Sequence, residues 1–357
     1  MATPAIDQSR LEAFLGQAVV DLAASFSAPL IRLGARLGLY RSLADGGPAT
    51  PDELAERSGT EPRMVREWLG NQAAGGYVIY DAASENYALP PEQAVALADE
   101  DSDFYLLGAY DILASFFADE DRLVEAFRSG TGLPWNEHDH RLFAGTEVFF
   151  RAGYRQHLVG GWLPALDGVV EKLGAGARVA DVGCGHGAST IIMAEAFPAS
   201  TFAGIDSHAG GIERARDAAA EAGVAERVRF EVAGADAFPG ADYDLVCVFD
   251  TFHDLGDPTR AAHHIREALA PNGTLMLVEP QAGDRTEDNL NPVGRIFYAG
   301  SALICVPHAI SDSDGHTPAL GAQAGEAALR TVLEQAGFRS VRRAAETPFN
   351  LVLEARP

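Results

Sequence analysis

The stretch Val179-Ala-Asp-Val-Gly-Cys-Gly-His-Gly-Ala-Ser-Thr190 decides how the second half of the chain folds. Its first four residues predict the end of a buried strand, and Ala188 to Phe197 predicts a helix. Between them, Gly183, Gly185 and Gly187 stand at alternate positions. Glycines let the backbone turn tightly and bring N–H groups close to a ligand, since a Cβ would collide there. A turn of this kind is typical of nucleotide- and nucleoside-binding folds, and alone it does not separate them.

Two later strands end in acids that narrow the range of ligands the turn could bind. Residues 202–206 predict a second apolar strand, and its last residue, Asp206, is placed to accept hydrogen bonds from ribose hydroxyls. Residues 230–236 predict a third strand that ends in Asp236, which could bind an adenine amino group or form an Asx turn. Ala188 replaces the third glycine of a dinucleotide fingerprint, and no P-loop motif is present. The sequence therefore predicts a nucleoside ligand without a long phosphate chain.

Strands and helices alternate from residue 175 onward. We expect strands near residues 178–182, 201–205, 227–232, 244–248, 273–278, 338–343 and 349–354. This alternation predicts an α/β fold with a Rossmann-like, doubly wound and mostly parallel sheet. The last two strands predict an antiparallel edge hairpin. Ligands of such sheets bind at the carboxyl ends of the strands, where the glycine turn and both acids would meet.

These motifs, followed by Tyr243-Asp-Leu-Val-Cys-Val-Phe249 and Pro271-Asn-Gly-Thr-Leu-Met-Leu-Val-Glu279, stand in the order found in class I S-adenosylmethionine-dependent methyltransferases. The chain resembles that family over about residues 155–357, and a Rossmann-like domain with an NAD-type cofactor is the alternative. The resemblance implies S-adenosyl-L-methionine as cofactor. It also implies cofactor contacts from the glycine turn and the strand ends, namely Asp181, Gly183, Gly185, Gly187, Asp206, Ser207, Asp236, Ala237, Phe249 and Asp250.

A histidine after the fourth expected strand is the candidate base. His253 lies in Phe249-Asp-Thr-Phe-His-Asp-Leu-Gly-Asp-Pro258, which resembles the segment of plant-type small-molecule O-methyltransferases that holds their catalytic histidine. Glu279 falls where that family has a glutamate that orients the histidine. The resemblance implies that His253 is the general base and that Glu279 fixes its tautomer. The alternatives are a packing histidine and a strand-end acid bonded to backbone.

Other positions near His253 depart from the family or suggest a metal. The family's further glutamate corresponds to Gln323, and its cofactor-contacting lysine corresponds to Phe249. Asp254 and Asp257 could bind a metal together with His253, but we expect both to cap the start of the next helix. The sequence therefore predicts no metal.

The N-terminal residues predict a winged-helix-like arrangement. Residues 8–44 and 50–73 predict helices interrupted at Pro29, and residues 75–80 and 86–89 predict a small hairpin. In the small-molecule O-methyltransferases that the chain resembles, a domain of this kind serves dimerisation, so we expect a homodimer.

A ligand-sensing transcriptional regulator is the alternative use of a winged helix. The candidate recognition helix, near residues 62–73, carries Arg63 and Arg66 beside Glu61 and Glu67 and has no basic cluster. The whole chain has 51 acidic against 27 basic residues and a formal net charge of −24. That charge opposes phosphate contacts and binding to anionic lipid, so we expect neither a nucleic acid nor a membrane as partner.

Length, cysteines and aromatic residues complete the expectations. The chain of 357 residues allows a winged-helix-like dimerisation domain over 1–95, a helical linker and substrate-pocket segment over 96–170, and a methyltransferase domain over 171–357. Three cysteines without a C-x-x-C pair, and no signal peptide, predict a cytoplasmic protein. The aromatic residues of the middle segment predict a substrate pocket between the domains, with an ordinary apolar core as the alternative. Residues 130–140 predict a solvated loop, with a metal site as the alternative. The predicted function is methyl transfer to a small-molecule hydroxyl, with N- or C-methylation as the rival within the enzyme class.

Overall fold

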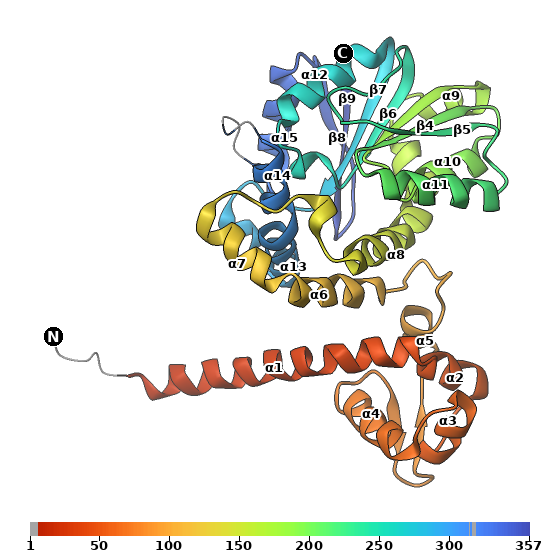
Figure 1. Ribbon diagram of the computed structural model, residues 1–357, viewed down its shortest axis with the longest axis vertical. Coiled ribbons are helices and arrows are strands. Elements are labelled where there is room, and N and C mark those ends of the chain that lie inside the picture. The colour runs from red at the N-terminus through yellow and green to blue at the C-terminus, as the bar shows by residue number, and fades with distance from the viewer. Residues whose placement is uncertain (1–5, 314, 316–318) are drawn as a thin grey trace. The chain divides into compact units, whose positions relative to one another are not determined.

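The computed structural model of the chain (Figure 1) describes residues 6–313, 315 and 319–357. The chain divides into two compact units. The first contains the chain up to Ala114 together with Ala144–Ala152, and the second contains Ser115–Phe143 and Gly153–Pro357.

The first unit has the predicted order of helices followed by a hairpin. Its elements are α1 (Gln8–Arg36), α2 (Leu39–Gly46), α3 (Pro51–Ser58), α4 (Pro62–Ala74), β1 (Ile79–Asp81), β2 (Asn86–Ala88), α5 (Pro91–Leu97) and the first part of α6 (Gly108–Ala118). A capping box precedes α3, because the Thr50 hydroxyl accepts from the Glu53 N–H and the Glu53 carboxylate accepts from the Thr50 N–H. The winged-helix arrangement predicted from the sequence is therefore confirmed.

Helix α1 is longer than the sequence predicted. It is continuous from Gln8 to Arg36 with Pro29 inside it, so the predicted interruption at Pro29 was wrong. The flanking Ala28 and Ile31 are buried, and the Trp68 indole N–H donates to the Leu30 carbonyl at 2.8 Å. This packing against α4 holds the helix across the one hydrogen bond that a proline removes.

The second unit is built on a seven-stranded sheet. Its strands are β3 (Arg178–Val182), β4 (Thr201–Asp206), β5 (Val228–Val232), β6 (Tyr243–Phe249), β7 (Leu269–Pro280), β8 (Ser340–Glu346) and β9 (Asn350–Arg356). Their order in the sheet is β5-β4-β3-β6-β7-β9-β8. The first five pair in parallel, β9 runs antiparallel to β7, and β8 runs antiparallel to β9. The predicted doubly wound sheet with an antiparallel edge hairpin is confirmed.

Helices cover both faces of this sheet (Figure 1). The longer helices that follow α6 along the chain are α7 (Glu120–Ser129), α8 (His140–His157), α9 (Val169–Ala175), α10 (Ala188–Ala196), α11 (Ala209–Glu221), α12 (Pro258–Ala268), α13 (Pro292–Gly300), α14 (Val306–Asp312) and α15 (Gly325–Gln335). Ala144–Ala152 of α8 belongs to the first unit. Shorter turns are η1 (Trp135–Glu137), η2 (Leu158–Trp162), η3 (Leu163–Ala165), η4 (Phe252–Asp254), η5 (Thr286–Asn289) and η6 (Ser301–Cys305).

Two separate apolar cores form because the side chains of each strand alternate between the faces. In β6, Leu245 and Cys247 pack with α10 and α11, whereas Val246 and Val248 pack with α12 and α15. All four side chains are almost completely buried. A strand that is buried on both faces has a nearly continuous run of apolar residues, and the sequence of β6 has such a run.

Two long apolar helical stretches stand out in the described part of the chain. Gln8–Arg36 and Pro292–Asp312 are long and apolar enough to cross a membrane by length and composition alone.

Candidate functional site

The glycine turn after β3 is held in place by its neighbours along the sheet edge. The N–H groups of Gly183 and Cys184 both donate to the Ile205 carbonyl, at 2.8 and 3.0 Å. Gly183 has φ +79°, and a Cβ there would lie 2.4 Å from the Thr251 hydroxyl oxygen. Gly187 has φ +81° and faces the Phe230 ring. At Gly183 and Gly187 the predicted requirement for glycine therefore has a visible cause, which is the close approach of the turn to Thr251 after β6 and to the Phe230 ring of β5, whereas at Gly185 a Cβ would meet nothing within 4 Å.

Asp181 lies beneath this turn and ties it to α10. Its side chain is 1% exposed, and its Oδ2 accepts hydrogen bonds from the hydroxyls of Ser189 at 2.6 Å and Thr190 at 2.5 Å. Its Oδ1 is buried without a hydrogen-bond partner among the described residues. Burial raises the pKa of Asp181 to about 6, although the two hydroxyls act in the opposite direction.

Asp206, at the end of β4, also closes the turn. Its Oδ2 accepts from the Gly185 N–H at 2.9 Å, and its Oδ1 accepts from the His208 N–H at 2.8 Å. The His208 ring in turn stacks on Phe143, with ring centres 4.6 Å apart. Each carboxylate oxygen has a second lone pair, so Asp206 keeps acceptor capacity for hydroxyl groups. The neighbouring Ser207 is exposed.

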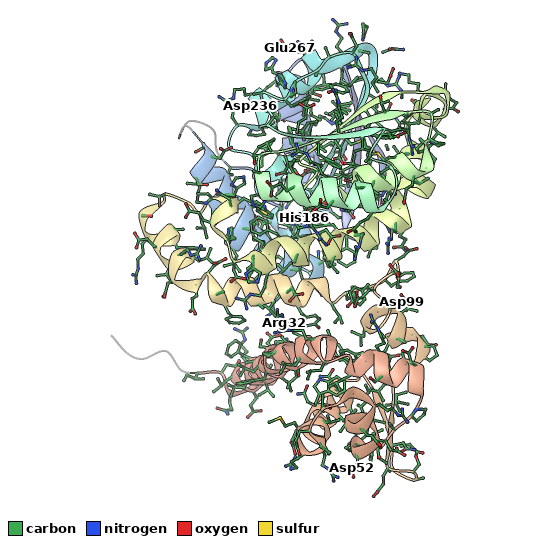
Figure 2. The ribbon with its side chains drawn as sticks, turned by 45° about the vertical axis from the view of Figure 1, so that its right-hand side comes forward. Arg32, Asp52, Asp99, His186, Asp236 and Glu267 are labelled. Atoms are coloured by element: carbon green, nitrogen blue, oxygen red, sulfur yellow. The ribbon has the colours of Figure 1, made fainter. Side chains whose placement is uncertain are left out.

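Asp236 follows β5 on an open loop (Figure 2). It forms an ion pair with Arg260 of α12, and the adjacent Ala237 is exposed. The Arg260 side chain is 67% exposed, so solvent weakens this ion pair.

Phe249 and Asp250 end the central strand β6. Phe249 is buried against Tyr154 and Trp162, with ring centres 5.1 and 6.3 Å away. Asp250 adopts φ +47°, a conformation that non-glycine residues rarely take. Its Oδ1 accepts from the Asn350 amide at 3.4 Å, whereas its buried Oδ2 has no partner among the described residues. Burial, followed by the nearby Glu279 carboxylate, raises the pKa of Asp250 well above its ordinary value.

His253 and Glu279 meet at the next strand end. The His253 Nδ1 lies 2.6 Å from the Glu279 Oε2, and the Phe252 N–H donates to the Oε1 of the same carboxylate at 3.0 Å. His253 is 4% and Glu279 is 1% exposed. Burial lowers the pKa of His253, but the adjacent Glu279 carboxylate outweighs it, and the pKa lies well above the ordinary value.

The opposite nitrogen of this ring meets a thiol that sequence analysis missed. The His253 Nε2 lies 3.3 Å from the Cys305 Sγ, and Cys305 is itself buried. Nothing in the sequence pointed to this residue, because 52 positions separate it from His253 and it lies in an apolar helical segment. The contact depends on η6, a short π-helical turn between α13 and α14.

One of the two acids that were expected to cap a helix does so, and the other does not. Asp257 is the N-cap of α12 and accepts from the Arg260 N–H at 2.9 Å, as predicted. Asp254 lies instead in the η4 turn beside His253, so its prediction as a cap was wrong. Burial raises the pKa of Asp254 to about 6, although His253 and His308 act in the opposite direction. In the described part of the chain, no three His, Cys, Asp or Glu side chains are grouped so as to hold a metal ion.

The expected solvated loop at residues 130–140 is partly buried, which corrects the prediction. The His138 and Asp119 side chains have no exposed surface, and the His138 Nδ1 lies 3.0 Å from the Asp119 Oδ2. The Asp139 N–H donates to the same oxygen at 2.9 Å. Trp135 lies between His138 and His308, with ring centres 6.3 Å from each. Polar residues that look solvated in sequence are here paired with an acid on another element.

Gln323 is half-buried near the site. The N–H of Gly321 donates to the His253 carbonyl at 2.9 Å, which brings the loop before α15 against η4. The Gln323 amide donates to the Ala322 carbonyl at 3.0 Å, and its Oε1 has no partner among the described residues.

Comparison with known proteins places both units. Residues 173–337 match the family described as a methyltransferase domain, and residues 25–99 match the Rv2258c-like winged HTH domain. The chain joins a winged helix-turn-helix domain to a methyltransferase domain. The resemblance to class I S-adenosylmethionine-dependent methyltransferases is thus confirmed, with S-adenosylmethionine as the cofactor of this domain.

The curated relatives match over part of their length. The 27-O-demethylrifamycin SV methyltransferase of Amycolatopsis mediterranei is 36% identical over 107 residues, which is 29% of this chain and 39% of that protein. The trans-aconitate 2-methyltransferase of Paracidovorax citrulli is 32% identical over 108 residues, which is 30% of this chain and 40% of that protein. The matched part of this chain thus spans about two fifths of each relative.

Solved structures match the whole fold. Human N-acetylserotonin methyltransferase, in complex with S-adenosylmethionine, has a TM-score of 0.69 at 16% identity, with 99% of each chain covered. The mitomycin 7-O-methyltransferase MmcR has a TM-score of 0.67 at 19% identity, with 98% of this chain and 100% of that one covered. At these identities the likeness establishes the fold.

The site residues fit a cationic nucleoside cofactor. S-adenosylmethionine carries a sulfonium and an ammonium group, and the strand ends present the buried oxygens Asp181 Oδ1 and Asp250 Oδ2 without partners among the described residues. Asp206 keeps acceptor capacity for ribose, and at Gly185 a Cβ would meet nothing within 4 Å. The acids and the open turn therefore suit the cofactor in charge and in shape.

Proposed function

We propose that the protein is an S-adenosylmethionine-dependent O-methyltransferase that acts on a small molecule, with His253 as general base and Glu279 as its orienting partner. The observation that carries the proposal is the 2.6 Å contact between the His253 Nδ1 and the Glu279 Oε2, at the same edge of the sheet as the glycine turn. The names of the relatives, several of which are O-methyltransferases, support transfer to oxygen.

The chain's own residues would supply position and a proton acceptor. When bound, the cofactor supplies an activated methyl group. Glu279 keeps the Nδ1 of His253 bonded, so that Nε2 is the nitrogen that takes the proton from the acceptor hydroxyl. Orientation of the reacting groups can contribute several kcal/mol to such a displacement. Asp181, Asp206, Asp236 and Asp250 would hold the cofactor together with the glycine turn.

Turnover should depend on pH in a defined direction. The imidazole must be neutral to accept a proton, and Glu279 holds the pKa of His253 above its ordinary value. Turnover should therefore rise as the pH increases through that raised pKa. A metal-assisted N- or C-methylation would not follow the titration of His253.

Calorimetry with S-adenosylhomocysteine tests the cofactor part of the proposal. The wild type should bind, the Asp206→Ala variant should lose most of the affinity, and Asp217→Ala, which removes an exposed acid of α11, should behave like wild type. The His253→Gln variant should retain binding and lose turnover with phenolic acceptors. Absence of binding in the wild type would reject the proposal. Wild-type turnover by His253→Gln would reject the base.

We further propose a homodimer formed through α1. Large apolar side chains of this helix are exposed, among them Phe14 at 67% and Phe26 at 76%. Figure 1 shows the N-terminal half of α1 extending beyond α2, α3 and α4. A second copy would present the same apolar surface in a two-fold arrangement, which would remove both surfaces from water.

Light scattering on size-exclusion fractions tests the dimer. The Phe14→Glu/Phe26→Glu double variant should be monomeric, and Gln17→Ala on the same helix should remain dimeric. A monomeric wild type would reject the proposal, and retention on vesicles would favour a membrane instead.

The cytoplasmic location also remains a proposal, supported by three buried free cysteines. The division of the chain into domains at residues 1–95, 96–170 and 171–357 is likewise a proposal.

DNA binding by the winged helix is the weaker candidate. Arg63 of α4 is paired with Glu67 of the same helix at 2.5 Å, and Glu61 caps its N-terminus. Arg63 is therefore neutralised locally, and Arg66 is the other basic side chain of this helix that could meet a phosphate. Retention of the protein on DNA at low salt would favour DNA binding as the role of the winged helix.

A further inference from the structure

We propose that Cys305 is a positioning residue for His253: its sulfur holds the Nε2 side of the ring in place and gives way to the acceptor hydroxyl. This inference rests on the proposed role of His253 as base. It extends that role to a residue outside the motif and the strand ends that form the rest of the site.

The two ring nitrogens of His253 are held from opposite sides. Glu279 contacts Nδ1 at 2.6 Å, and the Cys305 sulfur lies 3.3 Å from Nε2. All three side chains are buried. An imidazole held at both nitrogens cannot rotate without losing one contact. The thiol therefore restricts the ring on the side from which Glu279 cannot act.

The thiol is itself oriented by the backbone. The Cys305 thiol donates to the Gly300 carbonyl at 3.7 Å, within the π-helical turn η6. With its hydrogen directed there, the sulfur presents lone pairs to Nε2 and can accept the N–H of a protonated ring. With its hydrogen directed to Nε2 instead, the thiol donates to the neutral ring. The bond to the Gly300 carbonyl thus favours the charged state of His253, in the same direction as Glu279 does.

A thiol suits a contact that has to be exchanged. Sulfur is a weak donor and a weak acceptor, so an acceptor hydroxyl forms a stronger hydrogen bond with Nε2 than the thiol does. A serine at this position would hold Nε2 more firmly and compete with the acceptor. An alanine would leave Nε2 open and the ring less restricted.

The other cysteines differ from Cys305 in their surroundings. Burial raises the pKa of the Cys184 and Cys247 thiols well above the ordinary value. Cys247 lies next to the Met193 sulfur at 4.0 Å inside the sheet. Of the three cysteines, Cys305 is the one whose thiol contacts the His253 imidazole.

Imidazole NMR of selectively labelled histidine tests the proposal without any acceptor. The His253 signal is identified by its loss in the His253→Gln variant, and its titration is followed in the complex with S-adenosylhomocysteine. The charged or titratable groups that face the ring are Glu279, Asp250 and Asp254 in addition to Cys305. None of the other three is changed by the substitutions at position 305.

The variants give opposite expectations for a positioning and a merely structural role. Cys305→Ala should raise the proton dissociation constant of His253 at least threefold, and Cys305→Ser should restore it to within twofold of wild type. Ile304→Val, in the same turn and similarly buried, should leave it unchanged. Equal constants in wild type and Cys305→Ala would overturn the proposal, as would an equal change in all three variants.

Kinetics separate this inference from the proposed function. With a phenolic acceptor, Cys305→Ser should raise KM severalfold with kcat retained, whereas Cys305→Ala should lower kcat with little effect on KM. The reverse pattern would contradict exchange of the thiol for the acceptor. If the wild type does not bind S-adenosylhomocysteine, the proposed function fails, and the same NMR titration of the free protein still decides whether Cys305 acts on His253.

Discussion

Replacing Asp181 with asparagine should change how the stability of the protein depends on pH. The folded-state pKa of Asp181 is raised to about 6, against about 3.9 in an unfolded chain. For an acid with a raised pKa, the folded state binds the proton more tightly, so stability is greater at low pH and is lost as the pH rises through the folded pKa. Linkage gives a loss on the order of 1 kcal/mol between about pH 5 and pH 7.5.

Urea unfolding of the wild type and of Asp181→Asn checks this magnitude. The asparagine does not titrate and keeps an oxygen that can accept from the Ser189 and Thr190 hydroxyls. The free energy of unfolding of the wild type minus that of the variant should therefore fall by on the order of 1 kcal/mol over this pH interval. Asp217→Asn, which replaces an exposed acid, should show no such trend. A flat difference for Asp181→Asn would refute the reasoning.

The same titration should appear in cofactor binding. Above about pH 7, Asp181 is a buried carboxylate with one oxygen, Oδ1, lacking a partner among the described residues. A sulfonium close to this acid would offset the cost of that charge, and an analogue that lacks the sulfonium would not. S-adenosylmethionine should therefore lose affinity relative to S-adenosylhomocysteine as the pH falls from about 7.5 to 5. Parallel losses for the two ligands would place the sulfonium away from this acid.

Three further substitutions test separate parts of the site. Gly183→Ala should abolish S-adenosylhomocysteine binding in calorimetry, because the new Cβ would meet Thr251 at 2.4 Å and the φ of +79° disfavours a side chain; wild-type affinity would contradict this. Asp119→Ala should lower the free energy of unfolding by about 3 kcal/mol, since it leaves buried His138 without its partner; a change below 1 kcal/mol would show that the pair is not needed. Glu279→Gln should destabilise the protein most below about pH 6.5 and progressively less as the pH rises through the raised pKa of His253, because that raised pKa contributes stability that is lost when the ring loses its proton. A destabilisation by Glu279→Gln that grows as the pH rises would contradict this expectation.

The sequence predicted the sheet and the strand-end residues because local patterns encode both. The glycines at 183, 185 and 187 and the apolar runs of β3, β4 and β6 are local signals, and the rules for parallel sheets then place their carboxyl ends together. The contact between His253 and Glu279 followed from the family resemblance and is present in the structure. Their roles in the reaction remain proposals.

The contacts that escaped prediction depend on packing between distant elements. Cys305 reaches His253 through a π-helical turn that has no sequence signature. His138 looked like a residue of a solvated loop, and only the position of α7 brings the buried Asp119 to it. Pro29 remained inside α1 because packing on both sides of it outweighs the single hydrogen bond that proline removes. Each case is one in which tertiary contacts outweigh a local rule.

The charges at the sheet edge support a cationic ligand independently of any relative. Burial raises the pKa values of Asp181, Asp250 and Asp254, so the folded protein holds these carboxylates at a cost in stability near neutral pH. Protonated His253 offsets that cost for the acids nearest to it, chiefly Glu279. Asp181 lies under the glycine turn, and the neighbours that act on it are the Ser189 and Thr190 hydroxyls and a further acid, Asp206. A second cation that binds over the turn would stabilise the acids that His253 does not reach, and a sulfonium cofactor brings such a charge to the place where the methyl group must be transferred.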